Sequence, residues 1–211
     1  MAGVVGKKAG LNWYPEPRYD TVIFPAGALV TATYFSLPLG QIIAGGAVAK
    51  TTADTNLRNA AMIGKPNQFE LHGFAVEPAV APTAAGPVTL TADWALIYNT
   101  GVFTFQCGGN KNLLEVPLSR IPVAGGPTGF GTTVAGGAVM VNGVPFASNF
   151  YAFHKLITDE ATKKAGKVNL LLDGDTNFSV TITYPIGAGI TLTTATRVRV
   201  YMIGYYGSAI Q

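Results

Sequence analysis

Hydrophobic and polar side chains alternate with a period of two along several stretches of the chain, as they do in strands that bury one face. In residues 177–184 one face carries Phe178, Val180, Ile182 and Tyr184, and the other carries Ser179, Thr181 and Thr183. In residues 196–206 one face carries Arg197, Arg199 and Tyr201, and the other carries Val198, Val200 and Met202. Both stretches are therefore predicted to be amphipathic strands.

Shorter or less regular runs of β-branched and aromatic residues predict further strands. These runs are residues 20–24, 28–36, 66–78, 102–107, 113–116, 149–157 and 168–172, with a short strand at 41–43. Two dipeptides indicate hairpin turns: Asn142-Gly143, between VMV and VPF, and Asp173-Gly174, between 168–172 and 177–184.

One helix is predicted after Thr91, at the start of the stretch 93–130 around which the chain is organised. Thr91 is the expected cap, Asp93 the expected acidic residue of the first turn, and Gly101 the expected end. Trp94, Ile97 and Tyr98 follow the i, i+3, i+4 spacing of one apolar face. Residues 54–62 are expected to form one or two further helical turns, capped by Thr52 or Asp54.

Roughly eight to ten strands joined by long loops, with no repeat of 20–50 residues, predict an all-β fold. We expect an antiparallel double-sheet sandwich, most economically a single jelly roll, over residues 20–211. An immunoglobulin-like sandwich ranks second, because its connections are shorter and less rich in glycine.

Residues 1–19 are expected to form an irregular N-terminal arm. The glycines at 3, 6 and 10 make it flexible, and Trp13 and Tyr14 make it adhesive. Two interpretations remain open: a disordered tail, or an arm that docks on a neighbouring subunit. In the second, the cationic residues that would lie near phosphate or an acidic patch are Lys7, Lys8 and Arg18.

Charged residues are scarce in this 211-residue chain, at 12%, against about 25% in an ordinary soluble domain. The spans 21–49, 121–154 and 176–196 carry no formal charge. A hydrophobic content of 48% argues against disorder, and Pro and Gly interrupt the longest uncharged span too often for a membrane helix. No secretory signal is visible, and the net charge of +3 does not argue for nucleic acid. So little charge predicts that other subunits cover much of the surface.

The residues that usually carry chemistry are isolated. Cys107 lies beside Phe103 and Phe105 and is expected to be a buried structural thiol, and His72 and His154 lack the spacing of metal ligands. We expect no catalytic, cofactor-binding or metal-binding residue, and no enzymatic activity.

One further pattern has the spacing of a calcium loop, at Asp173, Asp175 and Asn177. Phe178 stands where that loop requires glycine, and Tyr184 where it requires glutamate. A hairpin turn is favoured, and a weak cation site at Asp173 and Asp175 is left open.

The order of elements resembles that of single jelly-roll capsid proteins of tailless icosahedral bacteriophages. The resemblance rests on TNLRNAAMIGKPNQFELHGFAVEP, on the helix followed by GVFTFQCGGNKNLLEVPLSRIP and a Gly-rich loop, and on RVRVYMIGYYGSAIQ. Together these stretches cover a little over a third of the chain.

The resemblance implies a structural protein of the virion, made in the host cytoplasm, that self-assembles into an icosahedral shell. Its partners would be copies of itself and other capsid proteins, with a basic face or arm towards the genome or an internal membrane, and no small-molecule substrate. It assigns no role to individual residues.

A carbohydrate-binding β-sandwich module of a fibre or secreted enzyme is the alternative. Exposed Trp or Tyr side chains on a flat sheet face would favour this alternative. Trp13 belongs to the arm and Trp94 is expected to point inwards, which counts against it. The loop 121–137 is the predicted interface with a neighbouring subunit.

Overall fold

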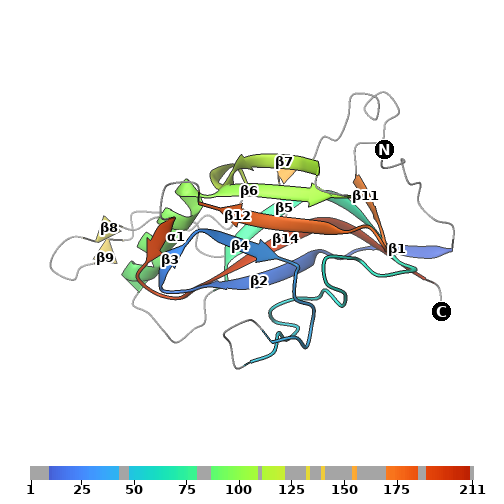
Figure 1. The fold of residues 1–211 in the computed structure, drawn as a ribbon, viewed down its shortest axis with the longest axis horizontal. Helices are drawn as coiled ribbons and strands as arrows, with labels where there is room; N and C mark the ends of the chain where they lie inside the picture. The colour runs from blue at the N-terminus through green and yellow to red at the C-terminus, as the bar shows by residue number, and fades with distance from the viewer. Residues whose placement is uncertain are drawn as a thin grey trace.

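The computed structural model describes residues 10–42, 48–79, 87–108, 111–121, 132–133, 139–140, 154–155, 170–184 and 189–209. Within these residues the protein is mostly β, with antiparallel sheets and one short α-helix (Figure 1). No helix of the described chain is long and apolar enough to cross a membrane.

The larger sheet has six strands and is organised around β14 (Thr196–Ala209). On one side β14 pairs with β5 (Gln68–Pro78), and on the other with β2 (Arg18–Phe24) and β1 (Leu11–Pro15). The far side of β5 pairs with β10 (His154–Lys155) and β11 (Leu170–Asp173). β14 is therefore the strand that joins the N-terminal strands to the rest of the sheet.

The smaller sheet has four strands in the order β4 (Thr31–Tyr34), β12 (Phe178–Thr183), β6 (Val102–Cys107) and β7 (Lys111–Pro117). Two short pairs lie outside both sheets. β3 (Gly27–Leu29) pairs with β13 (Ile190–Leu192), and β8 (Thr132–Thr133) pairs with β9 (Val139–Met140).

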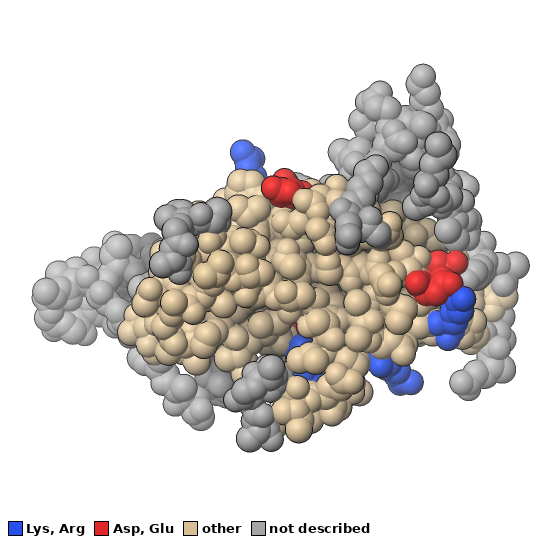
Figure 2. All heavy atoms as spheres, in the orientation of Figure 1, with Lys and Arg blue, Asp and Glu red and all other residues tan. Residues whose placement is uncertain are grey.

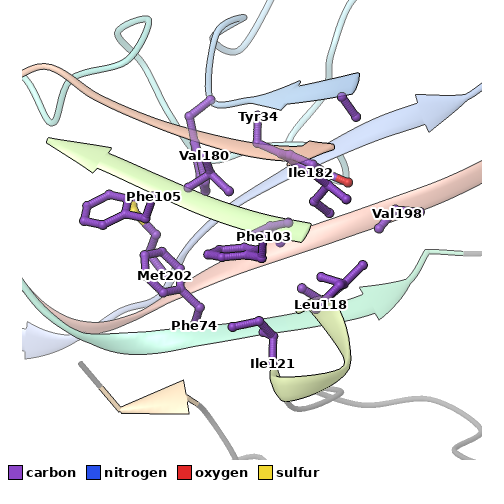
Figure 3. Packing of buried hydrophobic residues seen from close by; sticks show 14 of the residues in the cluster. Tyr34, Phe74, Phe103, Phe105, Leu118, Ile121, Val180, Ile182, Val198 and Met202 are labelled. Atoms are coloured by element: carbon purple, nitrogen blue, oxygen red, sulfur yellow. The ribbon is translucent and has the colours of Figure 1, made fainter. Parts of the chain in front are cut away.

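The buried faces of the two sheets meet in one core (Figure 3). Phe74 of β5 lies against both Phe103 and Phe105 of β6, with ring centroids 5.0 Å apart in each pair. The alternation predicted for the two amphipathic strands is confirmed, because the apolar residues of β12 and of the first half of β14 are all buried.

The helix α1 (Pro87–Thr100) is longer than predicted and lies at one end of the sheets (Figure 1). The prediction that Thr91 caps it and that Asp93 lies in its first turn is wrong, because the helix begins at Pro87. Proline suits a first helical position, where its missing N–H costs nothing. The predicted end is confirmed: the Gly101 N–H donates to the Ile97 carbonyl at 3.2 Å.

The hairpin predicted around Asp173-Gly174 is also wrong. β11 belongs to the six-stranded sheet through β5, whereas β12 pairs with β4 and β6 in the four-stranded sheet. The chain passes from the six-stranded sheet to the four-stranded sheet at Gly174. A Cβ there would lie 2.8 Å from backbone atoms of Gly64, Lys65 and Asn67, so the crossing has no room for a side chain.

Three smaller expectations need correction. Residues 54–62 form turns and an isolated bridge between Asn59 and Met62 rather than a helix. The strand expected at 28–36 is divided into β3 and β4, and Phe35 has a left-handed φ of 63°. The irregular backbone expected throughout 1–19 is wrong for β1, which pairs with β14 of the same chain.

Several predictions fall outside the described residues. These are the structure of residues 1–9, the turn at Asn142-Gly143, the charged segment 159–167 and most of the loop 121–137.

Candidate functional site: the connection between β4 and β5

The connection between β4 and β5 runs along the free edge of β2 and forms several polar contacts with that strand. Thr55 forms a bridge with Asp20, and its hydroxyl donates to the Tyr19 carbonyl at 3.0 Å. The Asn56 side chain accepts from the Tyr19 N–H at 3.0 Å and donates to the Pro17 carbonyl at 2.8 Å. These contacts occupy backbone groups that an edge strand would otherwise expose to other chains.

A buried ion pair fixes the base of this connection. Lys50 Nζ lies 2.5 Å from Asp20 Oδ1, and the two side chains are 2% and 0% exposed. The other carboxylate oxygen, Asp20 Oδ2, accepts a hydrogen bond from the Phe35 N–H at 2.7 Å. Burial raises the pKa of Asp20 above its ordinary value even though Lys50 acts to lower it. The pair is thus held where water cannot solvate it.

Arg197 of β14 holds the next turn of the connection through an ion pair with Asp54. The second oxygen of Asp54 accepts from the Thr51 N–H and from the Thr51 hydroxyl, both at 3.0 Å. Partial burial acts to raise the pKa of Asp54, but the Thr51 hydrogen bonds and the charges of Arg197 and Lys50 outweigh it, so that the pKa is lowered.

Arg199 forms a second anchor on the outer face of the six-stranded sheet. Its guanidinium donates to the Thr21 hydroxyl at 3.0 Å, to the Glu77 carboxylate at 2.9 Å and to the Ala53 carbonyl at 2.6 Å. The Tyr201 hydroxyl donates to the same Glu77 oxygen at 2.6 Å. Burial, together with this bond to a carboxylate, raises the pKa of Tyr201 to about 12.

The part of the connection next to Lys50 carries exposed apolar side chains. Gly40 N–H donates to the Lys50 carbonyl and Lys50 N–H to the Gln41 carbonyl, both at 2.9 Å, and residues 42 and 49 form a bridge. Around this small ladder Leu39, Ile42 and Val48 are 39%, 59% and 72% exposed. We call these three residues the apolar tip. Residues 43–47, between its two sides, are outside the described chain.

A cleft of about 490 Å³ lies at the other end of the connection, where it faces β1 and the end of β14. Its lining combines tyrosines, arginines and amides: Tyr14, Glu16, Arg18, Asn56, Leu57, Arg58, Asn59, Ile63, Pro66, Asn67, Tyr206, Ser208 and Ala209. The Arg18 guanidinium lies over the Tyr206 ring, 3.7 Å from its centroid, and pairs with Glu16 at 3.3 Å. Such a lining suits a polar ligand with flat faces.

The residues considered for chemistry are not brought together. Cys107 is half buried rather than buried, and burial raises the pKa of its thiol. His72 lies 3.3 Å from Glu70 and against the ring of Tyr205. The backbone of His154 lies in β10, next to Phe74 of β5.

The calcium-like spacing does not form a metal site in the structure. Asp175 pairs with Lys65 at 2.6 Å, and Asp173 Oδ1 accepts from the Gly174 N–H at 3.0 Å. Within the described residues no group of three or more His, Cys, Asp or Glu could hold a metal ion.

Sequence reasoning missed the buried pair and the cleft. Asp20 and Lys50 are thirty positions apart, and neither belongs to a motif. The signals that could have found the pair were an aspartate just before a long uncharged run and a lysine just after it.

Comparison of the chain with protein-family models, with curated proteins and with solved structures found no match.

Proposed function

We propose that this chain is a structural subunit of an icosahedral viral shell and is built on a single jelly roll. The order of strand pairing supports the jelly roll. The pairs are nested: β2 with β14, β4 with β12, β5 with β10 and β11, and β6 with β7. The contacts of β14 with β5 and of β12 with β6 join these pairs into two sheets. This is the arrangement expected when one long hairpin is rolled into a double sheet.

The distribution of charge supports a subunit whose surface is in contact with other subunits. Figure 2 shows one face of the molecule, over β4, β12 and β6, on which charged side chains are few and lie towards the rim. A protein that works alone in solution needs more surface charge than this to avoid association. The apolar tip adds three exposed hydrophobic side chains within one short segment, as protein–protein contacts often do.

In this proposal the subunit contacts copies of itself and other capsid proteins, through the apolar tip and the loop 121–137. Residues 1–9, with Lys7 and Lys8, are the part offered to the genome or to an internal membrane. The protein would be made in the host cytoplasm and reside in the virion. Such a role requires no catalytic residue, cofactor, metal or small-molecule substrate.

Assembly of the purified chain tests the proposal. We expect large symmetric particles by size-exclusion chromatography and negative-stain microscopy. The double substitution Ile42→Asp with Val48→Asp should abolish the particles and keep the β-sheet circular dichroism signal, because charge in an apolar contact is costly while the tip contributes little to the core. Val30→Asp, at a 52% exposed apolar position outside the tip, is the matched control and should still assemble.

A wild-type chain that stays monomeric at high concentration, alone and with its companion virion proteins, would contradict the shell role. Particles that persist in the double variant would move the contact away from the tip.

One observation favours a carbohydrate-binding role, the second candidate. The cleft presents Tyr14 and Tyr206 beside three asparagines, and such side chains can stack on sugar rings and hydrogen-bond to their hydroxyls. A glycan array distinguishes the two roles: specific binding by a stable monomer, lost in Tyr14→Ala, would favour the module and count against the shell.

A further inference from the structure

Two lysine–aspartate pairs of the described chain have nearly the same contact distance and opposite surroundings. Lys50 Nζ and Asp20 Oδ1 are 2.5 Å apart with side chains 2% and 0% exposed, whereas Lys65 Nζ and Asp175 Oδ2 are 2.6 Å apart with side chains 67% and 54% exposed. The exposed pair is in contact with water, so both groups keep their charges. The buried pair is shielded from water, so its two groups need not both remain charged.

A buried ion pair in a medium of low dielectric gains little from remaining charged, and transfer of one proton makes both partners neutral. Burial favours the protonated form of Asp20, since it raises the pKa of that carboxyl. A neutral amine is a nucleophile and a neutral carboxylic acid is an electrophile, while an ammonium and a carboxylate are neither. Holding the two groups in contact also replaces a bimolecular encounter with a positioned one, which can supply effective molarities of about 10⁵–10⁸ M.

We propose that Lys50 and Asp20 condense into an intramolecular amide bond that fastens the connection between β4 and β5 covalently to β2. This inference goes beyond the shell role and does not depend on it.

The reaction balances without a further reagent. Lys50 Nζ forms a bond to Asp20 Cγ, the Cγ–Oδ1 bond breaks, and Oδ1 leaves as water with the acid proton and one proton from the amine. No atom is oxidised or reduced. The remaining oxygen, Oδ2, carries the negative charge of the tetrahedral intermediate and already accepts the Phe35 N–H at 2.7 Å. A fixed backbone donor at that place stabilises such a charge, and the same bond is kept by the amide product.

The local backbone is built to hold this geometry. Phe35 adopts a left-handed φ of 63°, and its N–H points at Asp20 from the end of β4. Both backbone groups of Lys50 are bonded, its N–H to Gln41 and its carbonyl to Gly40, so the residue cannot drift from the carboxylate. Thr55 bridges Asp20 from the other side.

Mass spectrometry of the full-length purified chain tests the bond. We expect an intact mass lower than the sequence mass by one water molecule. Trypsin cleaves after Arg18, Lys50 and Arg58 but not at an acylated lysine, so the digest should contain residues 19–58 as one peptide, also lighter by one water. Fragmentation of that peptide should give no backbone ions from between positions 20 and 50, because the amide closes them in a ring.

Lys50→Arg keeps the cation but cannot form the bond, and should restore the full sequence mass. Lys65→Arg is the matched control at the exposed pair and should keep the loss of water. If Lys50→Arg fails to fold, the wild-type digest decides alone.

Two results would overturn the proposal. One is a wild-type mass equal to that of the sequence, with residues 51–58 released in full yield. The other is a loss of water with Lys50 still cleavable, which would indicate a cyclic imide at Asp20 instead of a link to Lys50.

Discussion

The outer faces of the two sheets carry different kinds of polar side chain. On the six-stranded sheet, Arg197 and Arg199 form ion pairs with Asp54 and Glu77. On the four-stranded sheet the outward residues are mostly neutral: Thr31, Thr33, Val102, Thr104, Gln106, Asn112, Pro117, Ser179, Thr181 and Thr183, with Glu115 as the one charged side chain described there.

The two faces also differ in what their polar groups contact. Arg199 reaches a carbonyl of the connection between β4 and β5, so the charges of the first face tie distant segments together. On the second face, Ser179 donates to Gln106 and Gln106 donates to Asn112 across neighbouring strands, and Asn112 donates to Glu115 within β7. Exposed neutral hydrogen bonds exchange with water at almost no net cost, whereas a half-buried charge that loses its partner is expensive. The first face is therefore expected to contribute more to the stability of the fold than the second does.

The largest effect is expected from Arg199→Met, on the charged face. The substitution leaves Glu77 and the Ala53 carbonyl without their cation and should lower the free energy of unfolding by about 2 kcal/mol in urea denaturation. Adding Glu77→Gln removes the stranded charge and should recover part of the loss. If Arg199→Met alone were as stable as the wild type, the charged face would contribute no more to stability than the neutral face does.

A smaller, pH-dependent effect is expected from Asp54→Asn on the same face. The folded pKa of Asp54 lies below its ordinary value of 3.8, so its contribution to stability is present above that value and is lost as the pH falls through the folded pKa. The variant should be less stable than the wild type at neutral pH, and the difference should shrink at about pH 3. Urea titrations at the two pH values measure it, and a difference that grows in acid would contradict the sign.

The smallest effect is expected from Thr181→Val, in the middle of the neutral face. Its neighbours Thr33 and Thr104 are also uncharged, and valine suits a strand, so the free energy of unfolding should stay within about 0.5 kcal/mol of the wild type. A loss above about 1 kcal/mol would mean that the outer face of the four-stranded sheet contributes to stability as the charged face does.

The sequence predicted the strands that alternate regularly, because burial of one face imposes a period that can be read locally. The faces of β12 and of the first half of β14 were assigned correctly, including the side on which Arg197 and Arg199 lie. The prediction failed where a local sequence pattern is used for a contact or a chain crossing that depends on the tertiary fold. Asp173-Gly174 has turn chemistry but changes sheets, and Asp54 has capping chemistry but is used by Thr51 and Arg197.

The candidate site was less predictable than the fold. Its residues come from β1, β2, β14 and the connection between β4 and β5, and no short-range spacing connects them. The proximity of Lys50 to Asp20 follows from the pairing of Thr55 with β2, which becomes visible once the chain is folded.

The position of β14 has a consequence for how the protein is made. A ribosome synthesises β2 and β5 long before β14, yet β14 is the strand that lies between them. Until it emerges, both earlier strands keep open edges, and the pairs that close the sheet link residues far apart in the chain. Folding dominated by such distant contacts takes about milliseconds to seconds, and the waiting edges are prone to pair with other chains. We therefore expect the sheet to close late, after translation of β14, and the yield of folded protein to depend on how well the nascent chain is kept from its neighbours.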